Sequence, residues 1–200
     1  MQKYSLILAT NNAHKLKEVR EILEPHNIIV YGLSDVDLHP EDVIENADNY
    51  YGNALIKAKS VAKLTKMPVI ADDSGLEIEA MDNKPGLLSA RFAKECGGHE
   101  KAFEVIFKSI KENRKARFIC DIVLLNEEDN PLLFEGITEG EIAKEAYGKG
   151  GFGYDPIFIC QETNKTYAEM SEEEKNKLSH RGKALQKLIE YLLKKNRIDR

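Results

Sequence analysis

Two adjacent carboxylates, Asp72 and Asp73, are the residues of this chain best suited to do chemistry. They follow the apolar run of residues 69–71 and precede Ser74 and Gly75. A buried strand that carries acids at its C-terminal end is a common way to build a metal site or a general base in an α/β protein. Asp, Ser and Gly are also ordinary turn residues, so a capped turn explains this stretch about equally well. Other polar clusters must decide between the two.

A second cluster lies in residues 10–15, which read Thr-Asn-Asn-Ala-His-Lys after a short apolar run. Asn11 or Asn12 can cap the helix that follows, and the free N–H groups and positive dipole end of that helix form an anion site. Lys15 adds a cation in the first turn, where the dipole does not favour one, so a phosphate partner is indicated. Because the loop lacks the glycines of the common phosphate-binding fingerprints, a solvated lysine is the alternative.

Further polar residues lie on or beside the other expected helices. Lys57 lies along the edge of a long amphipathic helix that ends before Pro68, and a solvated edge lysine is the alternative to a binding role. Lys175 falls in the early turns of a short helix that begins with a capping box. His180 and Arg181 interrupt the chain before the last helix, and a helix-breaking surface pair is their alternative interpretation.

The most unusual loop is formed by residues 148–156, which read Gly-Lys-Gly-Gly-Phe-Gly-Tyr-Asp-Pro. Glycines allow the backbone to approach a ligand closely, and an exposed aromatic ring offers a surface on which a base can stack. A flexible connector with its rings tucked into the core is the alternative. Since a mere linker needs no aromatic residues flanked by glycine, we favour a binding loop.

Alternating strands and helices position these clusters. The apolar runs predict strands at residues 5–9, 28–31, 69–71 with the two carboxylates at its end, 116–125, 132–135, 137–144 and 156–160. Residues 76–80 are a continuation or a separate strand, and residues 127–131 form a turn. The helical stripes lie at residues 16–23, 54–64, 99–113 and 185–193 and after Ser171. The middle third should be an antiparallel meander. The predicted fold class is therefore α/β, a mixed central sheet flanked by helices, with two lobes.

Length and composition suit one folded domain, residues 1–200, whose 42% hydrophobic residues can form a substantial interior. The net charge of −5 gives no support to a nucleic-acid surface. Because the first apolar run is too short for a signal peptide or a membrane span, a cytoplasmic protein with no membrane partner is expected. Cys96, Cys120 and Cys160 are widely spaced and odd in number, which argues against a disulfide framework, and Cys96 with His99 does not make a zinc site.

Taken together, the clusters resemble the inosine triphosphate pyrophosphatase family, also called XTP/dITP diphosphatases. The matching segments occur in family order and span nearly the whole chain. They are residues 10–15, Asn53-Ala54 with Lys57, residues 71–76, Pro85-Gly86 with Ser89-Ala90-Arg91, residues 150–158, and Glu174-Lys175 with residues 179–182. One such segment is a weak signal, whereas the ordered set is a strong one.

The resemblance implies hydrolysis of deaminated purine nucleoside triphosphates, such as ITP, dITP and XTP, to the monophosphate and pyrophosphate. It also implies dependence on Mg²⁺, an active-site cleft between two lobes, and a homodimer. Asp73 would be the catalytic base and a metal ligand, and Glu45 a second metal ligand. The implied substrate-binding residues are Thr10, Asn11, Asn12, Ala13, His14, Lys15, Lys57, Ser74, Phe152, Gly153, Tyr154, Asp155, Lys175, His180 and Arg181. Of these, Thr10, Asn12, Lys15, Lys57 and Lys175 would hold the triphosphate, and residues 152–155 with 180–181 would contact the base.

The chemistry of these residue types fits the implied roles. Attack of water between the α and β phosphates builds negative charge, which Mg²⁺ and a ring of lysines stabilise. Two neighbouring carboxylates would raise each other's pKa, and a bound cation counters that effect. Arg181 carries only donors, so it can bond the 6-oxo group of hypoxanthine or xanthine but not the 6-amino group of adenine. Asp72 stays ambiguous, since it can tune its neighbour or cap a turn.

The chain departs from the family pattern at Gly52, where a glutamate is usual. The assignment of Glu45 depends on counting back from Asn53 without a gap, so this departure bears on the metal geometry and on the local helix. Two other functions stay open at this point. One is a pyrophosphatase of the related Maf type, which acts on pyrimidine or modified nucleotides, and the other is a catalytically inactive nucleotide-binding regulator.

Overall fold

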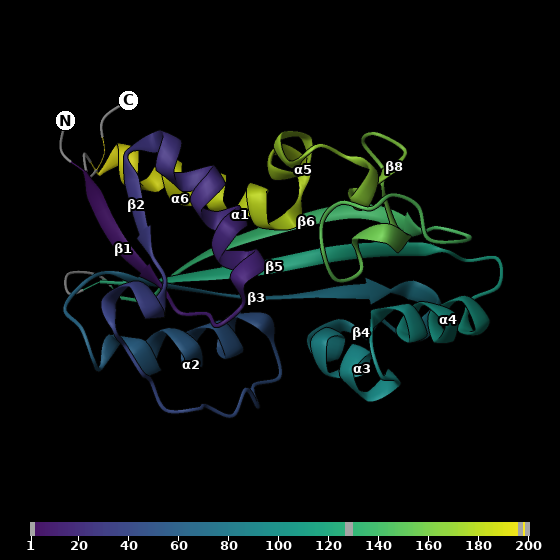
Figure 1. Ribbon diagram of the computed structural model, residues 1–200, viewed down its shortest axis with the longest axis horizontal. Coiled ribbons are helices and arrows are strands. Elements are labelled where there is room, and N and C mark those ends of the chain that lie inside the picture. Colours follow the sequence, from purple (N-terminus) through teal and green to yellow (C-terminus); the bar gives the residue numbers. More distant parts are fainter. Residues whose placement is uncertain (1–2, 127–129, 196–197, 199–200) are drawn as a thin grey trace. The chain divides into compact units, whose positions relative to one another are not determined.

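The chain forms an α/β fold in the computed structural model, which describes residues 3–126, 130–195 and 198. Its strands are β1 (Tyr4–Leu8), β2 (Ile28–Tyr31), β3 (Val69–Ile78), β4 (Lys84–Pro85), β5 (Lys115–Leu125), β6 (Leu132–Ile142), β7 (Phe158–Cys160) and β8 (Lys165–Thr166). Its helices are α1 (Ala13–Leu23), α2 (Tyr50–Ala62), α3 (Ser89–Cys96), α4 (His99–Ser109), α5 (Glu172–Leu178) and α6 (His180–Lys194). Figure 1 shows these elements along the chain.

The sheet is mixed, as the sequence predicts. Its strand order is β2-β1-β3-β5-β6-β7-β8, and β4 pairs with β3. β1 runs parallel to both β2 and β3, whereas the β3–β4, β6–β7 and β7–β8 pairs are antiparallel. The parallel pairs come from strand-helix-strand units, in which a helix must carry the chain back to the same edge.

The described residues divide into two compact units. The first is built within residues 1–73, 120–136 and 181–200, and the second within residues 74–119 and 137–180. In the second unit, Leu76 and Ile78 of β3 pack with Phe103 and Ile106 of α4 and with Phe158 of β7. The predicted cleft between two lobes stays a prediction.

The first unit is built on both faces of β3. Ile70 packs in one cluster with Leu188 and other residues of α6, and Val69 and Ala71 pack in another with Ala54 of α2. Figure 1 accordingly shows α1 and α6 on one face of these strands and α2 on the other. Because successive strand residues point to opposite faces, this alternation fixes where each following polar side chain of β3 must lie. Each large apolar side chain buried in these clusters contributes roughly 1.5–3 kcal/mol.

Several predicted boundaries are corrected by the structure. β3 is one strand of ten residues that continues through Asp72, Asp73, Ser74 and Gly75, so the carboxylates neither end a strand nor form a turn. Pairing with β1 before them and with β4 after them keeps this segment extended, and the continuation at residues 76–80 is thus the correct alternative as far as Ile78. β6 is also one strand where two were predicted, and α4 ends at Ser109 instead of residue 113. The turn predicted at residues 127–131 lies partly outside the described residues.

The predictions for the other elements and for the cysteines agree better with the structure. β2 and β5 lie where the apolar runs place them, and the capping box of Ser171 does open α5. Cys120 and Cys160 are fully buried, as expected of core residues. Among the described residues, no helix is long and apolar enough to cross a membrane.

Candidate active site

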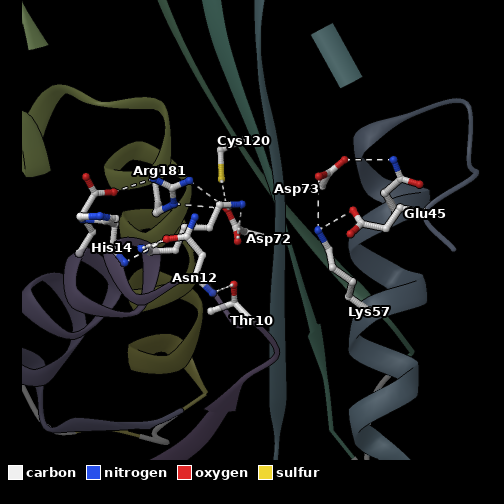
Figure 2. A network of polar contacts seen from close by, with 12 residues as sticks. Thr10, Asn12, His14, Glu45, Lys57, Asp72, Asp73, Cys120 and Arg181 are labelled. Atoms are coloured by element: carbon white, nitrogen blue, oxygen red, sulfur yellow. Dashed lines mark hydrogen bonds and ion pairs between the residues drawn. The ribbon is translucent and has the colours of Figure 1, made fainter. Parts of the chain in front are cut away.

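β3 separates the two neighbouring carboxylates onto opposite faces of the sheet. Figure 2 shows Asp72 on the side of Arg181 and Asp73 on the side of Lys57. The cause is the two-residue period of a strand, since Ile70 faces α6 and Ala71 faces α2. The two acids therefore have different neighbours, and each must be considered with its own.

Asp72 is held between cations. Lys15 Nζ lies 3.1 Å from its Oδ1 and 3.0 Å from its Oδ2, and Arg181 donates from Nε at 3.3 Å and from Nη2 at 3.0 Å to Oδ2. Its side chain is 2% exposed. Burial alone would raise the pKa of Asp72, but Lys15 and Arg181, with a smaller contribution from Lys57, hold it well below its usual range. Asp72 is thus a permanent anion.

Arg181 carries this network further into the unit. Its Nη1 donates to Glu18 of α1 at 2.6 Å, so the guanidinium joins α1, β3 and the start of α6. Burial would lower the pKa of Arg181, but Asp72 and Glu18 raise it above its usual value. Cys120 lies beside the pair, with Sγ 3.9 Å from Asp72 Oδ2, and its own pKa is raised by burial and by Asp72. A thiol of this kind is inert rather than nucleophilic.

Asp73 has a less complete set of partners. Lys57 Nζ lies 3.3 Å from Oδ1, and Asn53 donates from Nδ2 to Oδ2 at 3.2 Å. Asn53 and Lys57 are one turn apart on α2 and therefore share a helix face. Burial raises the pKa of Asp73 above its usual value, and the positive charges of Lys57 and Lys15 and the hydrogen bond from Asn53 only partly offset that effect. A buried carboxylate with a raised pKa is suited to accept a proton.

Lys57 also contacts Glu45, at 2.9 Å from Oε2, so its ammonium bridges Glu45 and Asp73. Burial alone would lower the pKa of Lys57, but Asp73, Asp72 and Glu45 outweigh burial and raise it. The carboxylates of Glu45 and Asp73 thus both contact one positive charge, the ammonium of Lys57. In the described part of the chain, no group of three His, Cys, Asp or Glu side chains is arranged to hold a metal ion. Mg²⁺ is usually held by only one or two carboxylates together with waters and phosphates, so Glu45 and Asp73 fit it.

The loop before α1 is capped as predicted, and the structure selects Asn12 as the cap. Its Oδ1 accepts from the backbone N–H groups of His14 at 3.0 Å and Lys15 at 3.1 Å, while Thr10 Oγ1 accepts from the N–H of Asn12 at 3.1 Å. Asn11, Asn12 and Ala13 are exposed. An anion that binds these N–H groups must therefore compete with the Asn12 side chain.

In the second unit, the glycine-rich loop folds over Lys175. Lys175 Nζ lies 2.6 Å from Asp155 Oδ2 and 4.7 Å from the centre of the Phe152 ring, and Asp155 also accepts from the N–H of Phe152 at 2.8 Å. Gly151 lies in the left-handed region, with φ of 68°, and a Cβ there would meet Asp155 Oδ2 at 2.0 Å. Glycine at this position is therefore required for the loop to close. Lys175 is buried and ion-paired.

The prediction of exposed aromatic rings in this loop is wrong for Tyr154. Its ring is buried in the core, its hydroxyl donates to the backbone oxygen of Ser89 at 2.7 Å, and burial raises its pKa. Phe152 is half-buried, as are Gly153 and Ser74. The alternative of rings tucked into the core thus holds for one of the two aromatic residues.

His180 and Arg181 are buried at the beginning of α6, so their interpretation as a helix-breaking surface pair is wrong. The His180 ring stacks on Phe118 with a centroid separation of 4.5 Å and an interplanar angle of 9°. Arg181 is engaged with Asp72 and Glu18, and its contact with a base stays a prediction that this geometry does not support.

Sequence patterns missed two residues of the Asp72 and Asp73 networks. Asn53 belongs to a matching segment but was given no role, although its position one turn before Lys57 was a usable signal. Glu18 is buried on α1 beside Arg181, an ion-pair partner that lies 163 positions away in the chain. Such a distant pair leaves no local signal.

Residues 6–191 match the Ham1 family. The dITP/XTP pyrophosphatase of Porphyromonas gingivalis is 45% identical over 192 residues, which cover 94% of this chain and 97% of that protein. The enzyme of the same name from Bacillus subtilis is 42% identical over 190 residues, with 93% and 96% covered.

Solved structures agree with this match. A Ham1 protein from Coxiella burnetii has a TM-score of 0.84 and 38% identity, over 96% of this chain and 99% of that chain. The Staphylococcus aureus Ham1 protein has a TM-score of 0.83 and 35% identity, with the same coverage. With the sequence and the fold in agreement over nearly the full length, the chain belongs to the Ham1 family.

Proposed function

We propose that this protein hydrolyses deaminated purine nucleoside triphosphates, such as dITP, XTP and ITP, to the monophosphate and pyrophosphate. The relatives named dITP/XTP pyrophosphatase support the substrate class and place the protein among hydrolases that act on phosphoanhydrides. The observation that carries the chemistry is the Asp73 group. A buried carboxylate with a raised pKa lies next to an ammonium, and a second carboxylate meets that ammonium from the other side.

Asp73 is the proposed general base. With a raised pKa, its carboxylate accepts a proton from an attacking water more readily than an ordinary aspartate does. Asn53 holds Oδ2 and Lys57 holds Oδ1, so the orientation of the carboxylate is set from α2. A base in the correct orientation typically accounts for about 10²–10⁴ in rate.

Glu45 and Asp73 are the proposed ligands of a divalent cation, with Mg²⁺ as the proposed ion. When bound, that ion would neutralise charge on the phosphates and polarise a phosphoryl oxygen. Lys57 would then contact phosphate oxygens in place of one carboxylate, since its ammonium can bond only acceptors. Lys15 is the corresponding cation at the start of α1, where Asp72 holds its ammonium.

Recognition of the base is proposed for residues 152–155 and His180, whereas Lys175 is proposed to hold the triphosphate. The 6-oxo group of hypoxanthine or xanthine requires a donor, and a donor there opposes the 6-amino group of adenine. Arg181 could serve only if Asp72 or Glu18 released it, and separating a buried ion pair typically costs about 3–5 kcal/mol. Selection of the base by Arg181 therefore requires that this ion-paired network opens first.

The reaction is tested by incubating the purified protein with dITP and Mg²⁺ and resolving the products by ion-exchange chromatography. We expect dIMP and pyrophosphate in equal amounts, whereas dIDP and orthophosphate would contradict the proposal. Turnover of dTTP in parallel separates a pyrimidine-directed pyrophosphatase from a purine-directed one. Loss of turnover in Asp73→Asn shows that this chain, and no contaminant, produces the signal.

A homodimer in the cytoplasm is the proposed biological form, on the strength of the family resemblance. Light scattering at micromolar concentration measures the mass directly, and a mass of about 23 kDa, against the 22.6 kDa of one chain, would contradict the dimer. Fractionation of the source cells tests the compartment.

A further inference from the structure

Asp121 is a buried carboxylate that no step of the proposed reaction uses. It lies on β5, which neighbours β3, and its residue is 6% exposed. Its neighbours in sequence fix its direction. Cys120 contacts Asp72 on the α6 face, and Val123 packs against Ala54 on the α2 face. Because strand residues alternate, Asp121 faces α2, as Asp73 does.

This position is unfavourable for a charge. Asp121 Oδ1 is buried and has no hydrogen-bond partner among the residues that the structure describes. Burial, then the negative charges of Glu135 and Asp73, raise the pKa of Asp121 to about 6. An apolar side chain would fill the same space without this penalty. We therefore expect an interaction of Asp121 that offsets the cost of burying its charge.

The first turn of α2 offers Asp121 such an interaction. Tyr51 lies in the first turn of α2 and packs in the same apolar cluster as Val123 of β5, on the face to which Asp121 points. Its backbone N–H also donates to Asp121, which favours the charged form of that carboxylate. Helices favour a carboxylate at this end, because it meets free N–H groups and the positive end of the dipole. The first turn reads Tyr50-Tyr51-Gly52-Asn53 and carries no carboxylate of its own.

The local cap of α2 leaves room for this contact. The Asn49 side chain accepts from the N–H of Gly52 at 2.7 Å, and the Asn49 carbonyl accepts from the N–H of Asn53 at 3.3 Å. A Cβ at Gly52 would meet Ala47 Cβ at 2.5 Å, so a larger residue with a charged side chain does not fit there in this backbone arrangement. A carboxylate at this helix end therefore comes from outside α2, and Asp121 on β5 provides one.

We propose that Asp121 is a positioning residue, which fixes the first turn of α2 on β5 and thereby holds Asn53 and Lys57 against Asp73. Asn53 and Lys57, which both contact Asp73, lie on α2 one turn apart, and Asn53 belongs to its first turn. A shift of this helix end by about 1 Å would move both of them, and misplacement of that size can cost about 10²-fold in rate. The inference rests on the proposed roles of Asp73 and Lys57.

The experiment is a double-mutant cycle on kcat for dITP. Asp121→Ala should lower kcat about 10- to 100-fold in the wild-type background, and by less than about 3-fold in a Lys57→Ala background, because the group that it positions is already gone. Asp121→Asn keeps an acceptor for the Tyr51 N–H and should stay within about 3-fold of wild type. Glu135→Gln removes the exposed carboxylate whose negative charge acts on Asp121, and it serves as the matched control, with kcat unchanged.

Equal losses from Asp121→Ala in both backgrounds would overturn the inference, as would a loss in Asp121→Asn as large as in Asp121→Ala. Thermal unfolding of every variant identifies a folding defect. Should Asp121→Ala not fold, Asp121→Ser replaces it in the cycle with the same expected outcomes, since its short side chain does not reach the helix end as a carboxylate does. A wild-type protein that releases no pyrophosphate from dITP would instead refute the proposed function.

Discussion

Asp72 and Asp73 are neighbours in the chain, yet the fold gives them opposite properties. Asp72 is surrounded by Lys15 and Arg181, which hold its pKa well below the usual range, whereas burial raises the pKa of Asp73 despite its contact with Lys57. The strand places them on opposite faces, so each belongs to a different packing cluster (Figure 2). The number and closeness of cations, and not burial itself, determine which carboxylate stays ionised.

The difference supports a structural role for Asp72 and the proposed chemical role for Asp73. On the Asp72 face, Arg181 and Glu18 complete an ion-paired network that ties α1, β3 and α6 together. On the Asp73 face, one ammonium serves both Asp73 and Glu45, so the negative charge exceeds the positive charge. A face with excess negative charge can accept a proton or a cation, and a neutralised face cannot.

The largest effect is expected on activity, from Asp73→Asn. The amide keeps the shape and can still contact Asn53 and Lys57, but it cannot accept a proton from water at neutral pH. We expect kcat for dITP to fall about 10³-fold, the usual range for loss of a general base. The free energy of unfolding should change by no more than about 1 kcal/mol. A variant that retained more than a tenth of the wild-type kcat would refute the assignment of Asp73.

Asp72→Asn should instead act on stability. Removing one partner of a buried ion pair leaves the other charge uncompensated, which typically costs about 3–5 kcal/mol. Urea unfolding followed by circular dichroism measures this loss. The free energy of unfolding of the wild-type protein should also depend on pH through Asp72. Because its folded pKa is depressed, the contribution of Asp72 is present above the unfolded pKa near 4 and is lost as pH falls below it. An inactive but fully stable Asp72→Asn would reverse the comparison of the two faces.

The sequence predicted the sheet and most residues of the Asp73 site, but it did not predict that Asp72 and Asp73 lie on opposite faces of β3. The alternation of apolar runs and helical stripes predicted the mixed sheet. The family resemblance, and not the periodicity, implied a common site for Asp73, Lys57 and Glu45, which contact one another through Lys57 in the structure. The course of β3 was not predictable locally, since Asp-Asp-Ser-Gly favours a turn and only pairing with β1 and β4 keeps it extended. Side chains alternate between the two faces of a sheet only along an unbroken strand. The opposite directions of Asp72 and Asp73 therefore follow only once β3 is known to be continuous.

The burial of long polar side chains was also beyond the sequence. Arg181 and Tyr154 both carry donors that would suit a ligand, and both are used inside the protein, by Asp72 and by the backbone of Ser89. Their partners lie 109 and 65 positions away in the chain. Patterns within a window of a few residues report which face of an element is apolar, but not which distant group satisfies a polar atom.

Binding of Mg²⁺ should distinguish the faces without any measurement of turnover. If Glu45 and Asp73 hold the ion, Mg²⁺ at about 100 times its dissociation constant should stabilise the folded protein by about 2.7 kcal/mol. Glu45→Gln and Asp73→Asn should each reduce this gain in thermal unfolding, whereas the exposed control Asp42→Asn should keep it. The comparison would fail if Asp72→Asn removed the gain and Asp73→Asn did not.

The smallest expected effect is on the pH dependence of stability, through Asp121. This residue lies on β5 and faces α2, as Asp73 does. Its pKa is raised to about 6, so the folded protein binds a proton more tightly than the unfolded chain between about pH 4 and 6. The free energy of unfolding therefore falls as pH rises through this window, and the penalty persists above it. Asp121→Asn removes this term, so its stability relative to wild type should be about 1–2 kcal/mol more favourable at pH 8 than at pH 4. Asp42→Asn, an exposed change of the same kind, should show no such difference. If the gap between Asp121→Asn and wild type were constant from pH 4 to 8, Asp121 would carry no buried charge, and the excess negative charge on this face would be confined to Asp73 and Glu45.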